Sequence, residues 1–356
     1  MMRIYLDHNA TSPLRPSARA AMTAAFDKGG NASSVHAEGR AAHALIDDAR
    51  EAVAQALGVI APMVIFTSGG SEANNLAVRA AGIERVIGSA IEHPSLRCTQ
   101  TIPVDGDGLA DLDALDRMLA AGPPALVSVM LANNETGVIQ PVREVVDVAQ
   151  KHGALVHTDA VQAMGKVPVN FGLLGVDMMT VSGHKFGGPL GAGALIVRDG
   201  LVVQPLILGG GQELRRRAGT ENVAAIAGFG AVAKEKSFYF KELRDSLETG
   251  LEDDAVIFGR DAPRLPNTSC FAQPGFSADT LLMNFDLDGI AISSGSACSS
   301  GKVAKSHVLA AMGVAPDLAG SAIRVSLGWN SKMGDVKRFL TIYRKILTRH
   351  RARAAA

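Results

Sequence analysis

Short apolar runs alternate with segments of helical periodicity over the first two-thirds of the chain. Residues 63–67 are β-like, and residues 71–81 after them have the apolar spacing of a helix. Residues 142–152, which stop before Gly153, predict a second helix. Further strands are predicted at 86–91, 125–131, 154–159, 178–182 and 194–198. This alternation favours an α/β fold with a mostly parallel sheet covered by helices on both faces.

The pattern changes near residue 221. A long helix-favouring stretch at 223–251 is rich in Ala, Lys and Glu, and short strands at 267–271, 290–293 and 322–326 follow it. We therefore expect a second, smaller α+β domain. The division that we predict is a large domain over residues 14–245 and a small domain formed by residues 1–13 and 246–356.

Charge and cysteine content exclude several classes of protein. Lys plus Arg equals Asp plus Glu at 35 each, so no net field favours nucleic acid or an anionic membrane. The apolar runs are too short for a membrane span, and the N-terminus lacks a signal peptide's apolar segment. Cys98, Cys270 and Cys298 are widely separated, which argues against a disulfide framework and leaves room for a reactive thiol. We expect a cytoplasmic protein and, with no HExxH pair, no catalytic metal.

Polar residues follow several predicted strands, where ligands bind in α/β sheets. Residues 68–72 (SGGSE) open a helix and suit a phosphate, although a steric need for glycine explains such a turn equally well. His93 and Asp159 end two further strands, and by themselves they are as easily a loop residue and a helix cap. Lys185 follows another strand in SGHK, where the alternative is a solvated surface lysine.

Taken together, these residues suit one ligand. Pyridoxal phosphate needs a phosphate cradle, a group that stacks on its ring, an acid at its ring nitrogen and a lysine at its aldehyde. The chain offers each of these once, at the ends of successive strands. We therefore predict pyridoxal 5'-phosphate as the cofactor.

Nine motifs resemble those of the cysteine desulfurases, in the right order and over nearly the whole chain. Two of them, SGHK at 182–185 and SGSACSS at 294–300, are together quite specific for this family. The resemblance is to the iron–sulfur-cluster assembly branch, whose catalytic cysteine lies on a long loop. It implies the aspartate-aminotransferase-like fold (fold type I), a large domain that binds the cofactor, and a small domain that carries Cys298. The other motifs are YLDHNAT (5–11), NASSVH (31–36), TSGGSEANN (67–75), NNETGVIQ (133–140), HTDAVQ (157–162), RAGT (217–220) and AIRVSLG (322–328).

The resemblance also implies a role for each matching residue. Lys185 would bind the cofactor covalently, and His93 would stack on its ring and act as acid and base. Asp159 would pair with the ring nitrogen and Gln162 with the ring hydroxyl side, with Asn134 near both cofactor and substrate. Cys298 would take the substrate sulfur as a persulfide, leaving L-alanine. Its Ser- and Gly-rich neighbourhood suits that task, although a surface loop with a spare thiol has the same composition.

The phosphate and the substrate carboxylate have their own implied partners. Thr220 matches a position that reaches the phosphate from the other subunit, so a homodimer is implied, and Arg324 matches the residue that binds the substrate carboxylate. Within the subunit, the phosphate would be held by Gly70, Ser71, Ser182 and His184.

Other activities remain open at this point. A selenocysteine lyase, a cysteine-sulfinate enzyme or an aminotransferase would share the cofactor residues, but an aminotransferase has no need of Cys298. A sulfur-trafficking scaffold without catalysis would need neither Lys185 nor Cys298. The sulfur acceptor is also open: an iron–sulfur scaffold protein, a tRNA-thiolation or DNA-modification pathway, or a dedicated metalloenzyme would each fit.

Overall fold

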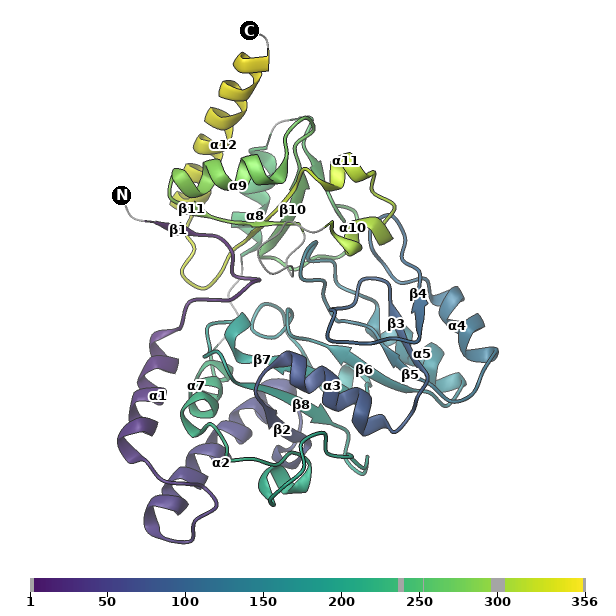
Figure 1. Ribbon diagram of the computed structural model, residues 1–356, viewed down its shortest axis with the longest axis vertical. Coiled ribbons are helices and arrows are strands. Elements are labelled where there is room, and N and C mark those ends of the chain that lie inside the picture. The colour runs from purple at the N-terminus through teal and green to yellow at the C-terminus, as the bar shows by residue number, and fades with distance from the viewer. Residues whose placement is uncertain (1–2, 236–239, 252, 296–304, 355–356) are drawn as a thin grey trace.

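The computed structural model describes residues 3–235, 240–251, 253–295 and 305–354, and Figure 1 shows their arrangement. A seven-stranded sheet forms the larger part, in the order β2-β8-β7-β6-β5-β3-β4. Only β8 runs antiparallel to its neighbours, so the expected mixed, mostly parallel sheet is confirmed. The strands are β2 (Val64–Thr67), β3 (Val86–Ser89), β4 (Gln100–Ile102), β5 (Leu126–Ser128), β6 (Leu155–Asp159), β7 (Met178–Ser182) and β8 (Gly193–Val197).

Alternation along the strands assigns each side chain to one face of this sheet. Ile65, Met178 and Leu195 are buried together with Leu76 of α3 (Gly70–Ala81) on one face. Their neighbours along the strands face a second core on the other side. That core is covered by α2 (Ala37–Leu57), α4 (Leu112–Ala120), α5 (Val142–Lys151) and α7 (Val223–Ala233), with α1 (Pro16–Lys28) packed on α7.

The long helix-favouring stretch at residues 223–251 does not form one continuous helix. The structure has two helices there, α7 and α8 (Lys241–Thr249). α7 is apolar on all sides and is buried against α1 and α2, whereas α8 is amphipathic and packs on α12 (Met333–Ala354). Helix propensity is high throughout this stretch, so it could not reveal that the two halves pack in different parts of the molecule.

A smaller, antiparallel sheet lies above the large one in Figure 1. Its core contains Phe271, Phe285 and Phe339, and the last two rings stack with centroids 4.6 Å apart. Its strands are β9 (Val256–Ile257), β10 (Thr268–Ala272), β12 (Ser293–Ser294) and β13 (Ala322–Ser326), and α9 (Ala278–Leu287) and α12 pack beside it. The remaining elements are α6 (Phe171–Leu174), α10 (His307–Ala311), α11 (Pro316–Ala319) and 3₁₀ turns at Ala61–Met63, Gly183–Lys185 and Gln212–Arg215.

The N-terminal segment joins the smaller part of the molecule. β1 (Ile4–Tyr5) pairs in parallel with β11 (Ile290–Ala291), and Asp7 forms a bridge with Ser326. This pairing favours the assignment of residues 1–13 to the small domain. The predicted boundary at residue 245 falls inside α8, and the division stays a prediction. No described helix combines the length and apolar character needed to cross a membrane.

An ion pair between α2 and the 3₁₀ turn at Gln212–Arg215 fixes an unusual backbone. Glu213, Leu214 and Arg215 all have positive φ, at 46°, 54° and 65°. Arg50 donates to both carboxylate oxygens of Glu213 at 2.7 and 2.9 Å, and the Phe66 amide donates to the same group at 2.9 Å. Left-handed backbone is costly for residues other than glycine, so this pair compensates a local strain.

Replacing Arg50 by Ala should therefore destabilise the fold. Glu213 would keep a buried carboxylate without its cation, at a cost of about 3 kcal/mol or more. Arg143→Ala is the control, because its pair with Asp147 is about half exposed and is worth at most about 1 kcal/mol. Urea denaturation measures both, and equal losses in the two variants would contradict this assignment.

Candidate active site

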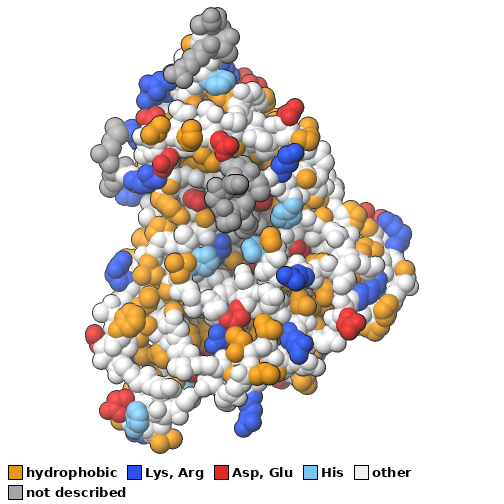
Figure 2. Space-filling view, in the orientation of Figure 1, with side chains coloured by type: hydrophobic (Ala, Val, Ile, Leu, Met, Phe, Trp, Pro, Cys, Tyr) orange, Lys and Arg blue, Asp and Glu red, His pale blue; other side chains and the backbone are white. Residues whose placement is uncertain are grey.

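A cavity of about 310 Å³ opens at the carboxyl edge of the large sheet, where β2, β3, β6 and β7 end. In Figure 2, histidine and basic side chains gather in the hollow between the larger and smaller parts of the molecule. The cavity brings together nine of the twelve predicted site residues: Gly70, Ser71, His93, Asn134, Asp159, Gln162, Ser182, His184 and Lys185.

One end of the cavity is built to receive an anion. Gly70 is the first residue of α3, a 12-residue helix whose N-terminal N–H groups point toward this end. A Cβ at Gly193 would come within 2.7 Å of the Gly69 backbone, so glycine is needed for the close approach of β8. Ser182 Oγ is buried and has no hydrogen-bond partner among the described residues, which is a donor available for a ligand. Burial, and then the charges of Lys185 and Lys166, lower the pKa of His184 to about 4.

Asp159 is held by a side chain that we did not assign from the sequence. Asn74, on α3, donates from Nδ2 to Asp159 Oδ2 at 2.7 Å and to Ser95 Oγ at 2.9 Å. The other carboxylate oxygen of Asp159 accepts the Val161 amide at 2.9 Å. The carboxylate is therefore fixed in orientation at the end of β6.

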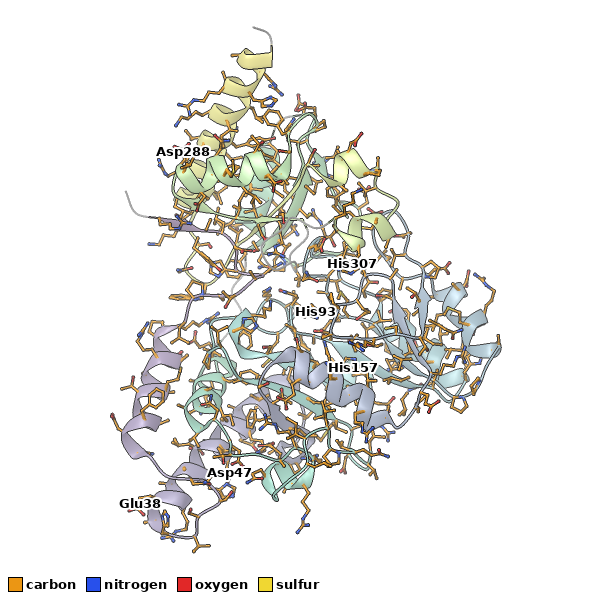
Figure 3. The ribbon with its side chains drawn as sticks, in the orientation of Figure 1. Glu38, Asp47, His93, His157, Asp288 and His307 are labelled. Atoms are coloured by element: carbon orange, nitrogen blue, oxygen red, sulfur yellow. The ribbon has the colours of Figure 1, made fainter. Side chains whose placement is uncertain are left out.

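The hydrogen-bond partners of His93 show which ring nitrogen carries the proton in its neutral form. The Ser95 amide donates to His93 Nδ1 at 3.1 Å, and Ser95 Oγ lies 2.7 Å from the same nitrogen. Because a backbone N–H is always a donor, Nδ1 accepts and the proton is on Nε2. Burial lowers the pKa of His93, Asp159 acts to raise it, and Lys185 and His307 act to lower it. Figure 3 shows His93 below His307.

Lys185 meets the N-terminal segment. Its Nζ donates to the main-chain oxygens of Asn9 at 2.8 Å and Ala10 at 3.0 Å. The 3₁₀ turn Gly183–Lys185 at the end of β7 places it there, and the Ser12 amide donates to His184 O at 2.7 Å to hold that turn. The amine thus lies in the cavity wall between the two parts of the molecule.

Three predicted residues lie outside this cavity. Thr220 is exposed in a separate hollow with Ser68 and Arg217. Arg324 is fully buried and donates to Asp7 Oδ1 at 2.7 Å and to Asn134 O at 3.0 Å, so it is linked to the cavity only through Asn134. Cys298 lies outside the described residues.

The larger side chains that were not assigned from the sequence are Asn9, Asn74 and Met130 in the cavity wall and the buried Lys166 behind it. Asn9 and Asn74 both lie in motifs that resembled the family, but neither received a role. A usable signal existed for Asn74, because it follows Gly70 by one helical turn and so shares its face of α3. No comparable signal existed for Asn9 or Lys166, whose contacts are set by tertiary structure.

Comparison with known proteins agrees with this architecture. The class-V aminotransferase family matches residues 4–339. A cysteine desulfurase IscS from Dictyoglomus turgidum is 38% identical, over 98% of this chain and 95% of its own. The structure of a NifS-like protein from Rickettsia africae superimposes with a TM-score of 0.91 at 37% identity, covering 97% and 99% of the two chains. A structure described as SspA in complex with cysteine gives 0.79 at 31% identity, covering 91% and 98%.

These similarities confirm the expected fold type I and the pyridoxal-phosphate dependence that goes with the family. They extend over both parts of the molecule and include the strands whose ends form the cavity. The chain therefore belongs to the cysteine desulfurases, within the pyridoxal-phosphate-dependent class-V aminotransferases.

Proposed function

We propose that this enzyme converts L-cysteine to L-alanine and holds the released sulfur as a persulfide on Cys298. The observation that carries the proposal is the meeting of Lys185, Asp159 and an anion-binding helix end around one cavity. The relatives named cysteine desulfurase, and the related structure described as holding cysteine, support the same substrate.

The cavity residues fit pyridoxal phosphate. Ser182 Oγ, without a partner among the described residues, and the N–H groups that open α3 suit the phosphate, with Ser71 and His184 beside them. Asp159 suits the ring nitrogen, since a carboxylate favours its protonated form. Gln162 suits the ring hydroxyl side, His93 the ring face, and Lys185 the aldehyde. When bound, the cofactor withdraws electrons from the Cα of an amino-acid substrate.

Each residue then has a defined task. Lys185 Nζ moves the proton from the substrate Cα. His93, with its proton on Nε2, presents a donor to the reacting atoms. The Cys298 thiolate attacks the substrate sulfur, so that an S–S bond forms as the Cβ–S bond breaks. The electron pair of the broken bond stays on Cβ, which takes up a proton to become the methyl group of alanine, and the substrate's thiol proton remains on the persulfide.

Arg324 and Asn134 would bind the substrate carboxylate. The Arg324 guanidinium is fully buried and is held by Asp7, and its Nε has no acceptor among the described residues. Its bond to the Asn134 carbonyl can be exchanged for a substrate carboxylate without moving Asp7. This arrangement selects a free α-carboxylate.

The described residues on either side of the Cys298 segment lie near the candidate active site. β12 ends at Ser294, and Ser293 pairs with Arg324 in the small sheet. On the other side of the segment, Ser306 Oγ donates to Glu135 and His307 donates from Nε2 to Glu92 O at 3.0 Å. One attachment point therefore lies beside Arg324, which donates to Asn134 of the cavity, and the other contacts Glu135 and Glu92, the chain neighbours of Asn134 and His93. This placement suits a sulfur-accepting cysteine.

A homodimer completes the phosphate site in this proposal. Thr220 is exposed, and Arg217 in the same RAGT motif pairs with Glu72 of α3 at 2.8 Å. Exposed Val202, Leu208 and Leu214 lie on the same stretch of chain and suit burial by a second copy. The sulfur acceptor that we propose is an iron–sulfur scaffold protein, in line with the relatives named IscS.

Replacing Cys298 by Ala should abolish sulfide release from cysteine and leave the visible absorbance of the bound cofactor unchanged, because only the sulfur nucleophile is lost. Cys98→Ser is the control and should keep full activity. Assays of sulfide and alanine with a thiol reductant measure the effect. Full activity in the Cys298 variant would exclude the persulfide route.

The role of Thr220 across the dimer can be tested with mixed subunits. Lys185→Ala chains combined with Thr220→Ala chains give heterodimers in which one site has both its own lysine and the partner's threonine. Titration with pyridoxal phosphate should then show half of the heterodimer's sites with wild-type affinity. Absence of any such sites, or a monomeric wild-type enzyme, would contradict an inter-subunit role.

Replacing Asn74 by Leu should raise the pKa of His93, while the proton of its neutral form stays on Nε2 because the Ser95 amide still donates to Nδ1. Ser95 Oγ would be free to accept from His93 Nδ1–H, and Asp159 would lose one neutral donor, so both changes favour the imidazolium. ¹⁵N NMR of histidine-labelled protein measures tautomer and pKa, with His93→Gln to assign the signal. Asn75→Leu is the matched control, since Asn75 donates to Ser71 O and Ser95 O at the surface. An unchanged His93 signal in the Asn74 variant would contradict this network.

A further inference from the structure

Lys166 is a buried amine directly behind the wall of the cavity. It follows the turn after β6, where Gly165 has φ of 77° and packs closely on Phe186. Its Nζ donates to Gln162 Oε1 at 2.6 Å and to Asn9 Oδ1 at 2.8 Å. Among the described residues, no carboxylate forms an ion pair with it. Buried lysines are rare and are usually paired with an acid, so this one needs another explanation.

The first partner of Lys166 is a residue that lines the cavity. Gln162 donates from Nε2 to Asn9 O at 3.0 Å and accepts Lys166 on Oε1. The reverse amide orientation would set Oε1 against the Asn9 main-chain oxygen, which is also an acceptor, and would take from Lys166 the acceptor that it has here, so these two contacts favour one orientation. The second N–H of Gln162 has no acceptor among the described residues. Gln162 therefore offers the cavity an N–H donor and not a carbonyl.

The second partner of Lys166 supports the predicted cofactor lysine. Asn9 is buried, and its main-chain oxygen accepts Lys185 at 2.8 Å. Its side-chain oxygen accepts Lys166 and also Asn267 Nδ2 at 3.2 Å. Lys166 thus contacts Gln162, which lines the cavity, and Asn9, whose main-chain oxygen accepts from Lys185.

The environment of Lys166 favours the neutral amine. Burial lowers the pKa of Lys166 well below its ordinary value, and the positive charges of Lys185 and Arg324 act in the same direction. A neutral amine has two N–H groups, and the structure supplies two acceptors. Both the amine and the ammonium have enough N–H groups for these two acceptors, so Lys166 can orient Gln162 and Asn9 in either protonation state.

We propose that Lys166 is a positioning residue that fixes the amide of Gln162 so that an N–H faces the cofactor's ring oxygen, and holds Asn9 in place beneath Lys185. The inference rests on the proposed function, because it takes the ligand of the cavity to be pyridoxal phosphate. It assigns no bond-making step to Lys166, which acts through its two neighbours.

A double-mutant cycle on cofactor binding tests this assignment. Lys166→Met keeps the length of the side chain and removes its N–H groups, and Gln162→Leu removes the oriented amide. Pyridoxal phosphate is titrated into the cofactor-free forms of wild type, both single variants and the double variant, and absorbance reports affinity and spectrum. Lys151→Met is the matched control, because Lys151 is an exposed lysine at the end of α5. Lys166→Gln, which keeps N–H donors, replaces the Met variant in the cycle if that variant does not fold.

We expect Lys166→Met to weaken binding about tenfold, the loss that one well-placed hydrogen bond supplies, and to shift the cofactor absorbance as Gln162→Leu does. Because part of the effect of Lys166 passes through Gln162 and part through Asn9, the double variant should lose less affinity than the product of the two single losses. Wild-type affinity and spectrum in Lys166→Met, or multiplying losses in the double variant, would overturn the role of Lys166. Failure of the wild type itself to bind pyridoxal phosphate would instead overturn the proposed function.

Discussion

The buried Asn9 is the point on which the arrangement of the site depends. Its main-chain oxygen accepts from Lys185 and Gln162, and its main-chain N–H donates to Ser326 Oγ at 3.0 Å. Its side-chain amide both donates and accepts hydrogen bonds. The side-chain partners are Lys166, Asn134, Asn267 and Thr268. These partners come from both parts of the molecule, and each buried polar group left unpaired would cost about 1–3 kcal/mol. The N-terminal segment therefore holds Lys185 in place and joins the two sheets with the same contacts.

The charges around the cavity follow a consistent pattern. Burial lowers the pKa of His184 to about 4 and also lowers the pKa values of His93 and Lys166, so burial acts on all three groups in favour of the neutral form. Two basic side chains have well-defined partners. Lys185 donates to two main-chain oxygens, and Arg324 forms an ion pair with Asp7. A site of this kind suits a ligand with a phosphate and a substrate with a carboxylate, and it avoids repulsion among its own cations.

The sequence predicted most strands of the large sheet because they are apolar runs that alternate with helical segments. It predicted several cavity residues because polar residues follow these runs. β7 and β13 were predicted to the residue, and the cavity residues followed from the ends of β2, β6 and β7. β4 (Gln100–Ile102) was not predicted, since a short, polar edge strand has no apolar signature. The separation of residues 223–251 into two helices depends on packing partners far away in the sequence, as do the contacts of Asn9 and the bond from Lys166 to Asn9, and local pattern cannot contain such partners. The roles of Cys298, which lies outside the described residues, and of Thr220, which would act across two subunits, remain predictions.

The most direct test of the account is to locate the covalent cofactor. The holoenzyme is reduced with borohydride, digested, and its peptides are sequenced by mass spectrometry, so that the modified lysine is identified without an activity assay. The account predicts one pyridoxyl adduct, on Lys185, and none on Lys166, whose amine is engaged behind the cavity wall. An adduct on Lys166, or no adduct on any lysine, would contradict it.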